Sequence, residues 1–404
     1  MIRKLKFFIA FVFIVQLFVQ PSQAEWGQWD PNFANGSPSL LSATDLYPSS
    51  VAIQPDGKIL VTGYKLSPLG SRQFFLLRYN STGGLDASFG RNGYADFRVP
   101  QLPPIRRLNS TSGEKIAILP DGRIAVAGRA NGDYAVWRFS SSGHGDTGFG
   151  IGGFQAMTNY PADGPVAIDV QDESLILGVV RSSNAVLLRL KRNGRIDTTF
   201  GDRGEVETVI YGPTFSMFVE SDSGKITVGG WNGVNFGRMR AERKMPDGED
   251  DPSFFADHQY SIPGGPQHML RLSNQKYVFQ TFQPTAPGFP PANSGLLGLD
   301  MFGGLETRFA FHIDDGTTNY APQVLAEQSD GQVIVSGFGH MYRINNDLDP
   351  RTLDLCDCGY SFVPFSNKTP AVLQRDNKMV YAGRLNVEGN LGLIRTLPYI
   401  SVAQ

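Results

Sequence analysis

The chain has 404 residues and a formal net charge of −2 at pH 7, with a pI near 6.2. This near-neutral balance offers no excess of Lys and Arg to attract phosphates, so nucleic acid is not an expected partner. A chain of this length buries a large core, so it does not need disulfides for stability, and it carries only 2 cysteines.

The first 24 residues read as an export signal. Arg3, Lys4 and Lys6 precede the apolar run from Phe7 to Gln20, and Ser22-Gln23-Ala24 has the small residues that signal peptidase accepts. We therefore expect cleavage after Ala24 and a secreted or periplasmic bacterial protein. The apolar run has 14 residues, fewer than the roughly 20 that span a bilayer. No membrane insertion is expected after cleavage.

The rest of the chain repeats one pattern seven times. PDGKILVTG at Pro55 returns as PDGRIAVAG at Pro120, and weaker copies follow to the end of the chain. A period near fifty predicts stacked or circular units, so residues 25–404 are expected to form one body. The aligned turn positions lie near residues 57, 122, 173, 224, 275, 331 and 377.

The first repeat contains four short strand-like runs. Residues 51–54 and 58–63 flank the turn Pro55-Asp56-Gly57, which predicts a tight hairpin. Residues 74–80 form a third run, and a fourth begins near Tyr94. Four antiparallel strands in about fifty residues are typical of a propeller blade. The sequence therefore predicts an all-β fold, a seven-bladed β-propeller with four-stranded blades.

The two ends of the chain each hold part of one repeat. Trp29-Asp30-Pro31-Asn32-Phe33 matches the end of a repeat, whereas the last copy stops after the run Leu391 to Arg395. We expect residues 25–45 to supply the last strand of the closing blade, because closure removes exposed sheet edges.

The second half of most repeats carries an acidic residue followed three positions later by Phe, with an Arg near the end of the third strand. In the fourth repeat, Arg240 is aligned as the arginine and Asp251 as the acidic residue. In the fifth repeat, Asp300 occupies the position of the arginine, and Glu306 is the acidic residue. Since Arg can hold a carboxylate through two hydrogen bonds, we expect structural anchors with the Phe between blades; a ring of acidic ligands is the alternative. In three repeats the Arg precedes the acid by eight residues: Arg78, Asp86 and Phe89; Arg138, Asp146 and Phe149; Arg189, Asp197 and Phe200.

The composite pattern PDGKILVTG, LLRYN and GGLDASFGRNG resembles the delta-60 repeat, a family of bacterial exported proteins. The first three repeats match well, and the fifth matches poorly. The resemblance implies an exported repeat protein and no particular reaction, because the family is defined by its repeat.

Ligand contacts are expected at the end of the ring that carries the blade links. The Pro-rich insertion Gln280–Ser294 and the link Arg98–Gly113 fall there, and loops on a rigid scaffold carry specificity. Aromatic side chains near these links either bind an unknown protein or glycan or fill gaps between blades: Tyr47, Tyr160, Tyr211, Phe282, Phe289, Tyr320 and Phe365.

Cys356 and Cys358 are the only cysteines. Export favours a disulfide, but residues two apart in an extended strand are poorly placed for one. A strained disulfide, two free thiols and a metal or redox site stay open.

No catalytic residue, metal site or cofactor is predicted. The 5 histidines have no HExxH spacing, and no G-x-S-x-G motif is present. We expect an exported, monomeric binding or scaffold module. The alternative is a propeller hydrolase or lyase with its active site in the central channel.

Overall fold

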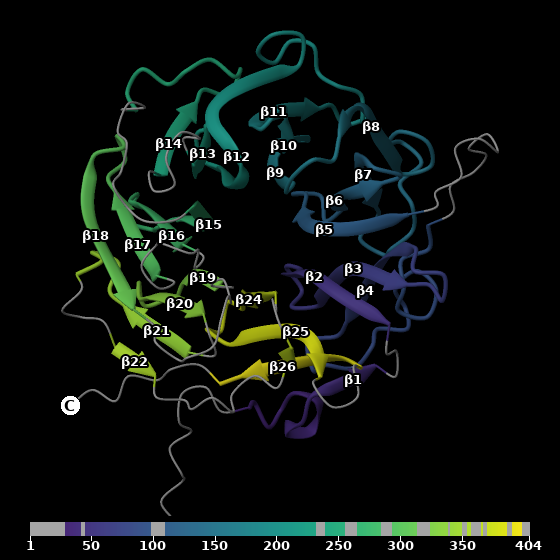
Figure 1. Ribbon diagram of the computed structural model, residues 1–404. Coiled ribbons are helices and arrows are strands. Elements are labelled where there is room, and N and C mark those ends of the chain that lie inside the picture. The colour runs from purple at the N-terminus through teal and green to yellow at the C-terminus, as the bar shows by residue number, and fades with distance from the viewer. Residues whose placement is uncertain are drawn as a thin grey trace, which may run out of the picture.

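The computed structural model describes residues 29–41, 45–97, 110–231, 239–254, 265–283, 293–312, 324–337, 340–349, 354–356, 365–366, 370–385 and 390–397. Its antiparallel sheets follow one another around a ring, and the two ends of the described chain meet in one blade (Figure 1). The predicted all-β, seven-bladed propeller is confirmed.

The first three blades are meanders whose strands pair in chain order. A fourth strand in blade 1 is reduced to isolated bridges such as Leu77 with Tyr94. Blade 1 contains β2 (Leu46–Ile53), β3 (Ile59–Leu66) and β4 (Arg72–Tyr79); blade 2 contains β5 (Thr111–Ile118), β6 (Ile124–Ala130), β7 (Asp133–Phe139) and β8 (Phe154–Pro161); blade 3 begins with β9 (Ala167–Gln171), β10 (Ser174–Arg181) and β11 (Asn184–Leu190).

One long strand belongs to two blades. β12 (Glu205–Val219) closes blade 3 by pairing with β11 and then becomes the inner strand of blade 4 by pairing with β13. The register shifts between Tyr211 and Phe215, where the strand passes from one sheet to the other. Tyr211, which the sequence placed near a link between blades, lies at this passage from blade 3 to blade 4, and the link is part of a continuous strand.

The remaining blades continue the same order. Short β23 (Phe365–Ser366) pairs with β25 beside the inner strand of blade 7. Blade 4 adds β13 (Ile226–Trp231) and β14 (Met239–Lys244); blade 5 contains β15 (Gly265–Arg271), β16 (Tyr277–Gln283), β17 (Asn293–Leu299) and β18 (Leu305–His312); blade 6 contains β19 (Val324–Glu327), β20 (Val333–Gly337), β21 (His340–Ile344) and β22 (Asp354–Cys356); blade 7 contains β24 (Ala371–Leu373), β25 (Met379–Leu385), β26 (Leu391–Thr396) and β1 (Ser39–Leu41).

The ring closes through the pairing of the two chain ends. β1 pairs antiparallel with β26, with Ser39 opposite Leu393, and the backbone N–H of Asp30 donates to Arg395 O at 2.8 Å. The inner strands β2, β5, β9, β12, β15, β19 and β24 contact one another in sequence, and β24 contacts β2 again. The predicted closing strand is confirmed, and we call this junction the seam.

The core lies between successive blades. Along β3, Ile59 and Val61 pack with side chains of blade 7, whereas Leu60 packs with Ile124 of blade 2. Successive side chains of a strand point to opposite faces of the sheet, so a blade with neighbours on both sides needs apolar residues at consecutive positions. This requirement explains the unbroken apolar runs that follow the repeated turns.

Among the described residues, no helix combines the length and the apolar character needed to cross a membrane. The expected export signal, residues 1–24, lies outside the described residues. It stays a prediction.

Candidate functional site

The Asp-x-x-Phe turn of blade 1 binds that blade to the next one. Arg78 Nε donates to Asp86 Oδ2 at 2.9 Å, and the guanidinium lies 4.4 Å from the centroid of Phe89. Arg78 Nη1 also donates to Ser141 O of blade 2 at 2.6 Å. Gly143 of that turn leaves room for Phe89, since a Cβ there would lie 2.7 Å from the ring. We call this arrangement of Arg, Asp, Phe and the next blade's turn the clamp.

Clamps recur at other junctions. The Nε–Oδ2 distances are 2.8 Å for Arg138 and Asp146 and 2.9 Å for Arg189 and Asp197. Their guanidinium groups lie 4.4 Å from the Phe149 ring and 4.8 Å from the Phe200 ring. The structure thus brings together each of the three predicted sets of anchor residues.

The seam has a clamp made from both ends of the chain. Arg395 Nε donates to Asp30 Oδ2 at 2.8 Å, and Lys378 adds a second cation at 3.0 Å from the same oxygen. The Arg395 guanidinium lies 4.7 Å from the Phe33 ring and donates to Ser81 O of blade 1 at 2.6 Å. The side chain of Asp30 is fully buried.

The alignment of the fourth repeat on Arg240 is wrong. Arg243 Nε donates to Asp251 Oδ2 at 2.6 Å, and its Nη1 donates to Met301 O of blade 5 at 2.8 Å. The eight-residue step between Arg and Asp in the first three repeats points to Arg243, so the sequence contained the signal that the alignment missed.

The fifth repeat has no such turn. Asp300 Oδ1 accepts the backbone N–H of Phe302 at 2.8 Å and of Gly304 at 2.7 Å, so it caps the turn between β17 and β18. Glu306 lies within β18 and pairs with Lys276 at 2.6 Å. The sequence alignment of Asp300 with the clamp arginines is therefore wrong.

The clamp aspartates are charged well below neutral pH. Partial burial raises the pKa of Asp86, but hydrogen bonds from Ser88 and the charge of Arg78 outweigh it and bring the pKa down to about 2. The pKa of Asp197 also falls to about 2, because Thr199 and Arg189 outweigh the burial. Each clamp therefore holds an intact ion pair across the physiological range.

Two acidic side chains of the inner strands, Glu114 of β5 and Asp169 of β9, make structural contacts. Glu114 Oε1 accepts from Arg129 Nε at 2.5 Å, and Asp169 Oδ2 accepts the N–H of Val219 at 2.8 Å, which joins blade 3 to blade 4. Burial raises the pKa of the Asp169 carboxyl. Within the described part of the chain, no group of three His, Cys, Asp or Glu could hold a metal ion.

The aromatic residues that the sequence analysis proposed as ligand contacts differ in how deeply they are buried. Tyr160 is 4 % exposed and packs in the core between blades 2 and 3, where its hydroxyl donates to Glu205. It is not a surface contact, because the chain that leads into blade 3 encloses it; it fills a gap between blades. Tyr47 is stacked on Tyr64, with ring centroids 5.0 Å apart, and lies under Arg384 at 4.2 Å.

Of the predicted aromatic residues with described side chains, Tyr211 is the most accessible, at 40 % exposure. Phe282 lies in β16, Phe365 begins β23, and Cys356 ends β22 opposite Met341. Phe289, Tyr320 and Cys358 lie outside the described residues. The three alternatives for Cys356 and Cys358, a strained disulfide, two free thiols and a metal or redox site, stay predictions.

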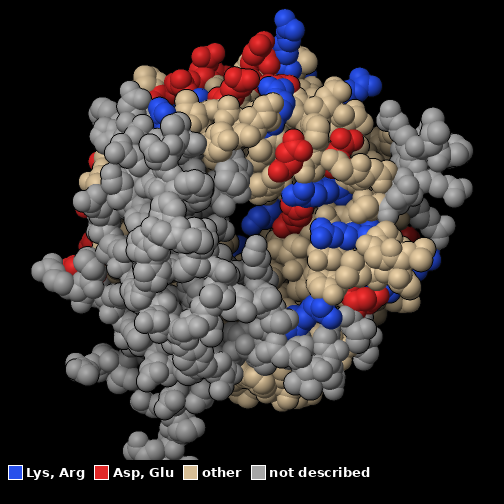
Figure 2. Space-filling view, viewed as in Figure 1, with Lys and Arg blue, Asp and Glu red and all other residues tan. Residues whose placement is uncertain are grey.

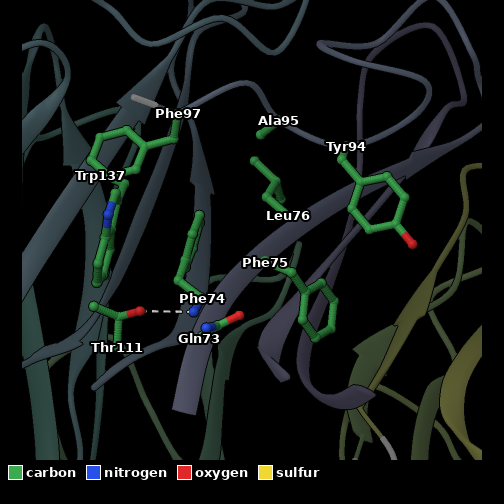
Figure 3. A pocket seen from close by; sticks show the side chains of 9 residues that line it. All are labelled: Gln73, Phe74, Phe75, Leu76, Tyr94, Ala95, Phe97, Thr111 and Trp137. Atoms are coloured by element: carbon green, nitrogen blue, oxygen red, sulfur yellow. Dashed lines mark hydrogen bonds between the residues drawn. The ribbon is translucent and has the colours of Figure 1, made fainter. Parts of the chain in front are cut away.

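A pocket of about 280 Å³ opens between blades 1 and 2 beside the start of β4 and of β5 (Figure 3). Phe74 stacks on Trp137 with centroids 4.6 Å apart, and Phe97 meets the Trp137 ring edge-on at 6.4 Å. Thr111 Oγ1 accepts the N–H of Phe74 at 2.8 Å, and Gln73 is exposed. We call this the aromatic pocket.

The aromatic pocket lies at the link end of the ring. β4 follows the turn after β3, and β5 follows the link from blade 1, so both strands begin at the same end. Trp137 Nε1 is buried and has no hydrogen-bond partner among the described residues. The sequence prediction placed ligands at this end but missed Phe74 and Trp137. Phe74 lies near the second turn of its repeat, which was an available signal for that residue.

The charges on the visible face agree with the near-neutral composition. Figure 2 shows acidic and basic side chains beside one another over the described blades, without a broad region of one sign. The aromatic pocket, rather than a charged surface, is the candidate functional site.

A family model described as "Domain of unknown function (DUF5122) beta-propeller" matches residues 54–89 and 119–149. These segments contain the Asp-Gly turns and the Asp-x-x-Phe turns of the first two repeats. A search of curated proteins found no match.

Solved structures with similar folds have low sequence identity. The extracellular domain of a hybrid two component system from B. thetaiotaomicron has a TM-score of 0.51 and 14% identity; the match covers 91% of this chain but only 39% of that one. YCF48 bound to D1 peptide has a TM-score of 0.51 and 10% identity, covering 90% of this chain and 95% of that chain.

The Dos1 propeller has a TM-score of 0.52 and 10% identity, covering 87% of this chain and 93% of that chain. At such identities the likenesses show the fold alone. The comparisons thus establish a β-propeller whose first two repeats are similar to the DUF5122 propeller domain.

Proposed function

We propose that this protein is an exported binding module that holds one ring-shaped group of a cell-envelope glycan or protein in the aromatic pocket. The observation that carries the proposal is the pocket itself, where aromatic rings from two blades meet polar groups. Ligand sites commonly combine an apolar lining with a few polar groups that fix orientation.

The size of the pocket limits its occupant. The volume of about 280 Å³ lies just below the roughly 300–1,000 Å³ typical of small-molecule sites. A single sugar ring or an aromatic side chain fits this volume better than an extended ligand. The exposed amide of Gln73 supplies hydrogen bonds that a purely apolar occupant would leave unused.

The export of the protein rests on its sequence. The first 24 residues have the features of a cleaved signal, and the repeats resemble the delta-60 family of bacterial exported proteins. We extend that family assignment to this chain as part of the proposal. Among the similar folds, one is an extracellular domain and another is bound to a peptide, which supports only the fold's capacity for such roles.

The test fills the pocket without disturbing the core. Gln73→Trp places a large ring at the mouth of the pocket, and Leu69→Trp adds the same ring on the turn just before β4, at a position that is 96% exposed and outside the pocket. Both variants and the wild type are assayed on a glycan array and in cell-envelope pull-downs, after melting curves show that they fold.

We expect wild type and Leu69→Trp to retain a partner that Gln73→Trp loses. Retention of every partner by all three proteins would rule out the aromatic pocket as the contact. A hydrolytic or lyase activity that survives in all three would favour the alternative of an enzyme with its site in the central channel.

A further inference from the structure

A second site is indicated on the opposite end of the ring, at the clamp between blades 2 and 3. In the other clamps, Nη1 of the arginine donates to a carbonyl of the next blade: Arg78 to Ser141 at 2.6 Å, Arg189 to Pro246 at 2.8 Å and Arg243 to Met301 at 2.8 Å. This contact gives each Nη1 a hydrogen-bond acceptor on the neighbouring blade.

The clamp of Arg138 departs from this pattern. Its side chain is 1 % exposed, and Nε donates to Asp146 at 2.8 Å, yet Nη1 has no hydrogen-bond partner within the described part of the chain. A buried, charged donor without a partner costs free energy, so something else is expected to satisfy it.

The turn of blade 2 also lacks a hydroxyl that other clamps have. Ser88 and Thr199 donate a hydroxyl to the clamp aspartate at 2.6 and 2.8 Å, and Thr199 Oγ1 also accepts from Arg189 at 3.3 Å. Blade 2 has Gly148 at that position, and only its backbone N–H reaches Asp146, at 3.0 Å. The missing side chain leaves space beside the Arg138 guanidinium.

That space is a hollow of about 500 Å³ bordered by four cations. Lys191 and Arg192 come from the turn of blade 3, where the corresponding turn of blade 2 has Ser140 and Ser141. The hollow is lined by the basic residues Arg123, Arg138, Lys191 and Arg192, by Asp146 as the one carboxylate, and by Gly148.

The two basic residues from blade 3 can turn toward a ligand. Arg192 is 58% exposed and pairs with Glu173, itself 72% exposed, at 3.2 Å. Lys191 is 49% exposed and lies 3.4 Å from Asp197. Exposed ion pairs of this kind contribute little free energy, so an anion in the hollow can compete for them.

We propose that this hollow, the basic clamp, binds a phosphate group, either as free phosphate or as a phosphate monoester. A dianionic group with several acceptor oxygens suits a site that combines guanidinium groups with an ammonium. The basic clamp lies on the turn end of the ring, so it is separate from the aromatic pocket and does not depend on the proposed function.

The test measures binding of inorganic phosphate and of glycerol phosphate by calorimetry, with sodium chloride at matched ionic strength as the reference. Arg192→Ser restores the residue type found in blade 2, and Gly148→Ser restores the missing hydroxyl. Arg195→Ser is the matched control, because it removes an exposed Arg from the same turn that does not border the hollow.

We expect Arg192→Ser to weaken binding of the phosphate ligand about tenfold, the loss produced by removing one charge-assisted hydrogen bond. Gly148→Ser should weaken it as well, and Arg195→Ser should leave it unchanged. Tight binding of glycerol phosphate alone would assign the site to a monoester, whereas equal binding of both would assign it to the phosphate group itself.

Two results would overturn the proposal. One is a wild-type response to both phosphates no larger than the response to chloride. The other is an equal loss of binding in Arg192→Ser and Arg195→Ser, which would show attraction to general surface charge. Because Arg192 is exposed, its variant keeps the test valid even if Gly148→Ser does not fold.

Discussion

The junctions of blades 1 to 4 and the seam differ from the junctions around blade 6 in how their turns are joined. The former use the buried clamp. At the latter, Ser273 of blade 5 donates from its N–H and Oγ to Glu327 of blade 6, both at 2.7 Å, and the Ser329 N–H donates to Asn377 of blade 7 at 2.9 Å. These hydrogen bonds are exposed, whereas the arginine and aspartate side chains of the clamps are largely buried.

The comparison shows that successive turns are joined both where the clamp is present and where it is replaced by exposed hydrogen bonds. When one partner of a buried pair such as Asp30 and Arg395 is lost, the other is left as an uncompensated buried charge, which costs free energy. When an exposed hydrogen bond is lost, water hydrogen-bonds to the remaining group instead, so the cost is small. Breaking a more deeply buried junction should therefore cause a larger loss of the free energy of unfolding.

The largest effect is expected at the seam. Deletion of residues 29–41 removes Asp30, Phe33 and β1, exposes the edge of β26 and leaves Arg395 unpaired. We expect loss of the cooperative thermal transition and aggregation, because an open edge strand invites pairing with another chain. Differential scanning calorimetry and light scattering measure this, and an unchanged melting curve would contradict closure by the N-terminal strand.

A smaller effect is expected within the ring. Asp86→Ala leaves the 6% exposed Arg78 side chain without its carboxylate and should lower the free energy of unfolding by about 1–3 kcal/mol. Urea denaturation measures the change. Asp56→Ala, which removes a 55% exposed carboxylate near the same Lys58, is the control and should change stability by under about 0.5 kcal/mol.

Ligand binding distinguishes the two interpretations of the clamp aspartates. If Asp86→Ala destabilises the protein and leaves its partner bound, the residue is an anchor. Full stability together with loss of the partner would instead support a ring of acidic ligands.

Acid should weaken the clamps in a defined range. The pKa of Asp86 and Asp197 is about 2 in the folded protein, below the ordinary value of 3.8. Their contribution is fully present above about pH 4 and is lost as the pH falls toward 2, at about 2 kcal/mol for each carboxylate. Urea denaturation midpoints at pH 5, 3.5 and 2.5 measure this loss. The midpoint should fall less with decreasing pH in Asp86→Ala than in the wild type. A decline of equal size in that variant would contradict the assignment to the clamp.

The smallest effect is expected in blade 5. Glu306 is 35% exposed and pairs with Lys276 at 2.6 Å outside any clamp. Glu306→Ala should change the free energy of unfolding by less than about 1 kcal/mol, the range of exposed ion pairs. If Glu306→Ala lowered the free energy of unfolding as much as Asp86→Ala, the size of the loss would not depend on how deeply the broken contact is buried.

Much of the fold could be predicted because each repeat carries its own turn chemistry. The Asp-Gly turns, the unbroken apolar runs and the split repeat at the chain ends together predict blades and their closure. The path of β12 could not be predicted, since Gly212 and Pro213 in the sequence favour a break where the structure has one continuous strand.

The sites were harder to predict because they depend on what covers a side chain. Tyr160 and Tyr211 both lie beside prolines in the sequence, yet one is buried under the chain entering blade 3 and the other is exposed. Arg240 and Arg243 both occur in β14, and only the geometry of the turn selects Arg243. Trp137 belongs to the aromatic pocket because two blades meet there, which no single repeat reveals.

The most direct test of closure by the clamp is a double-mutant cycle between the ends of the chain, with Asp30→Ala, Arg395→Ala and the double variant measured by urea denaturation. Because Arg395 contacts Asp30 at 2.7 and 2.8 Å, we predict that the double variant is more stable than the sum of the single losses by about 1–3 kcal/mol. Additivity of the two losses within about 0.5 kcal/mol would contradict a clamp that joins the two ends of the ring.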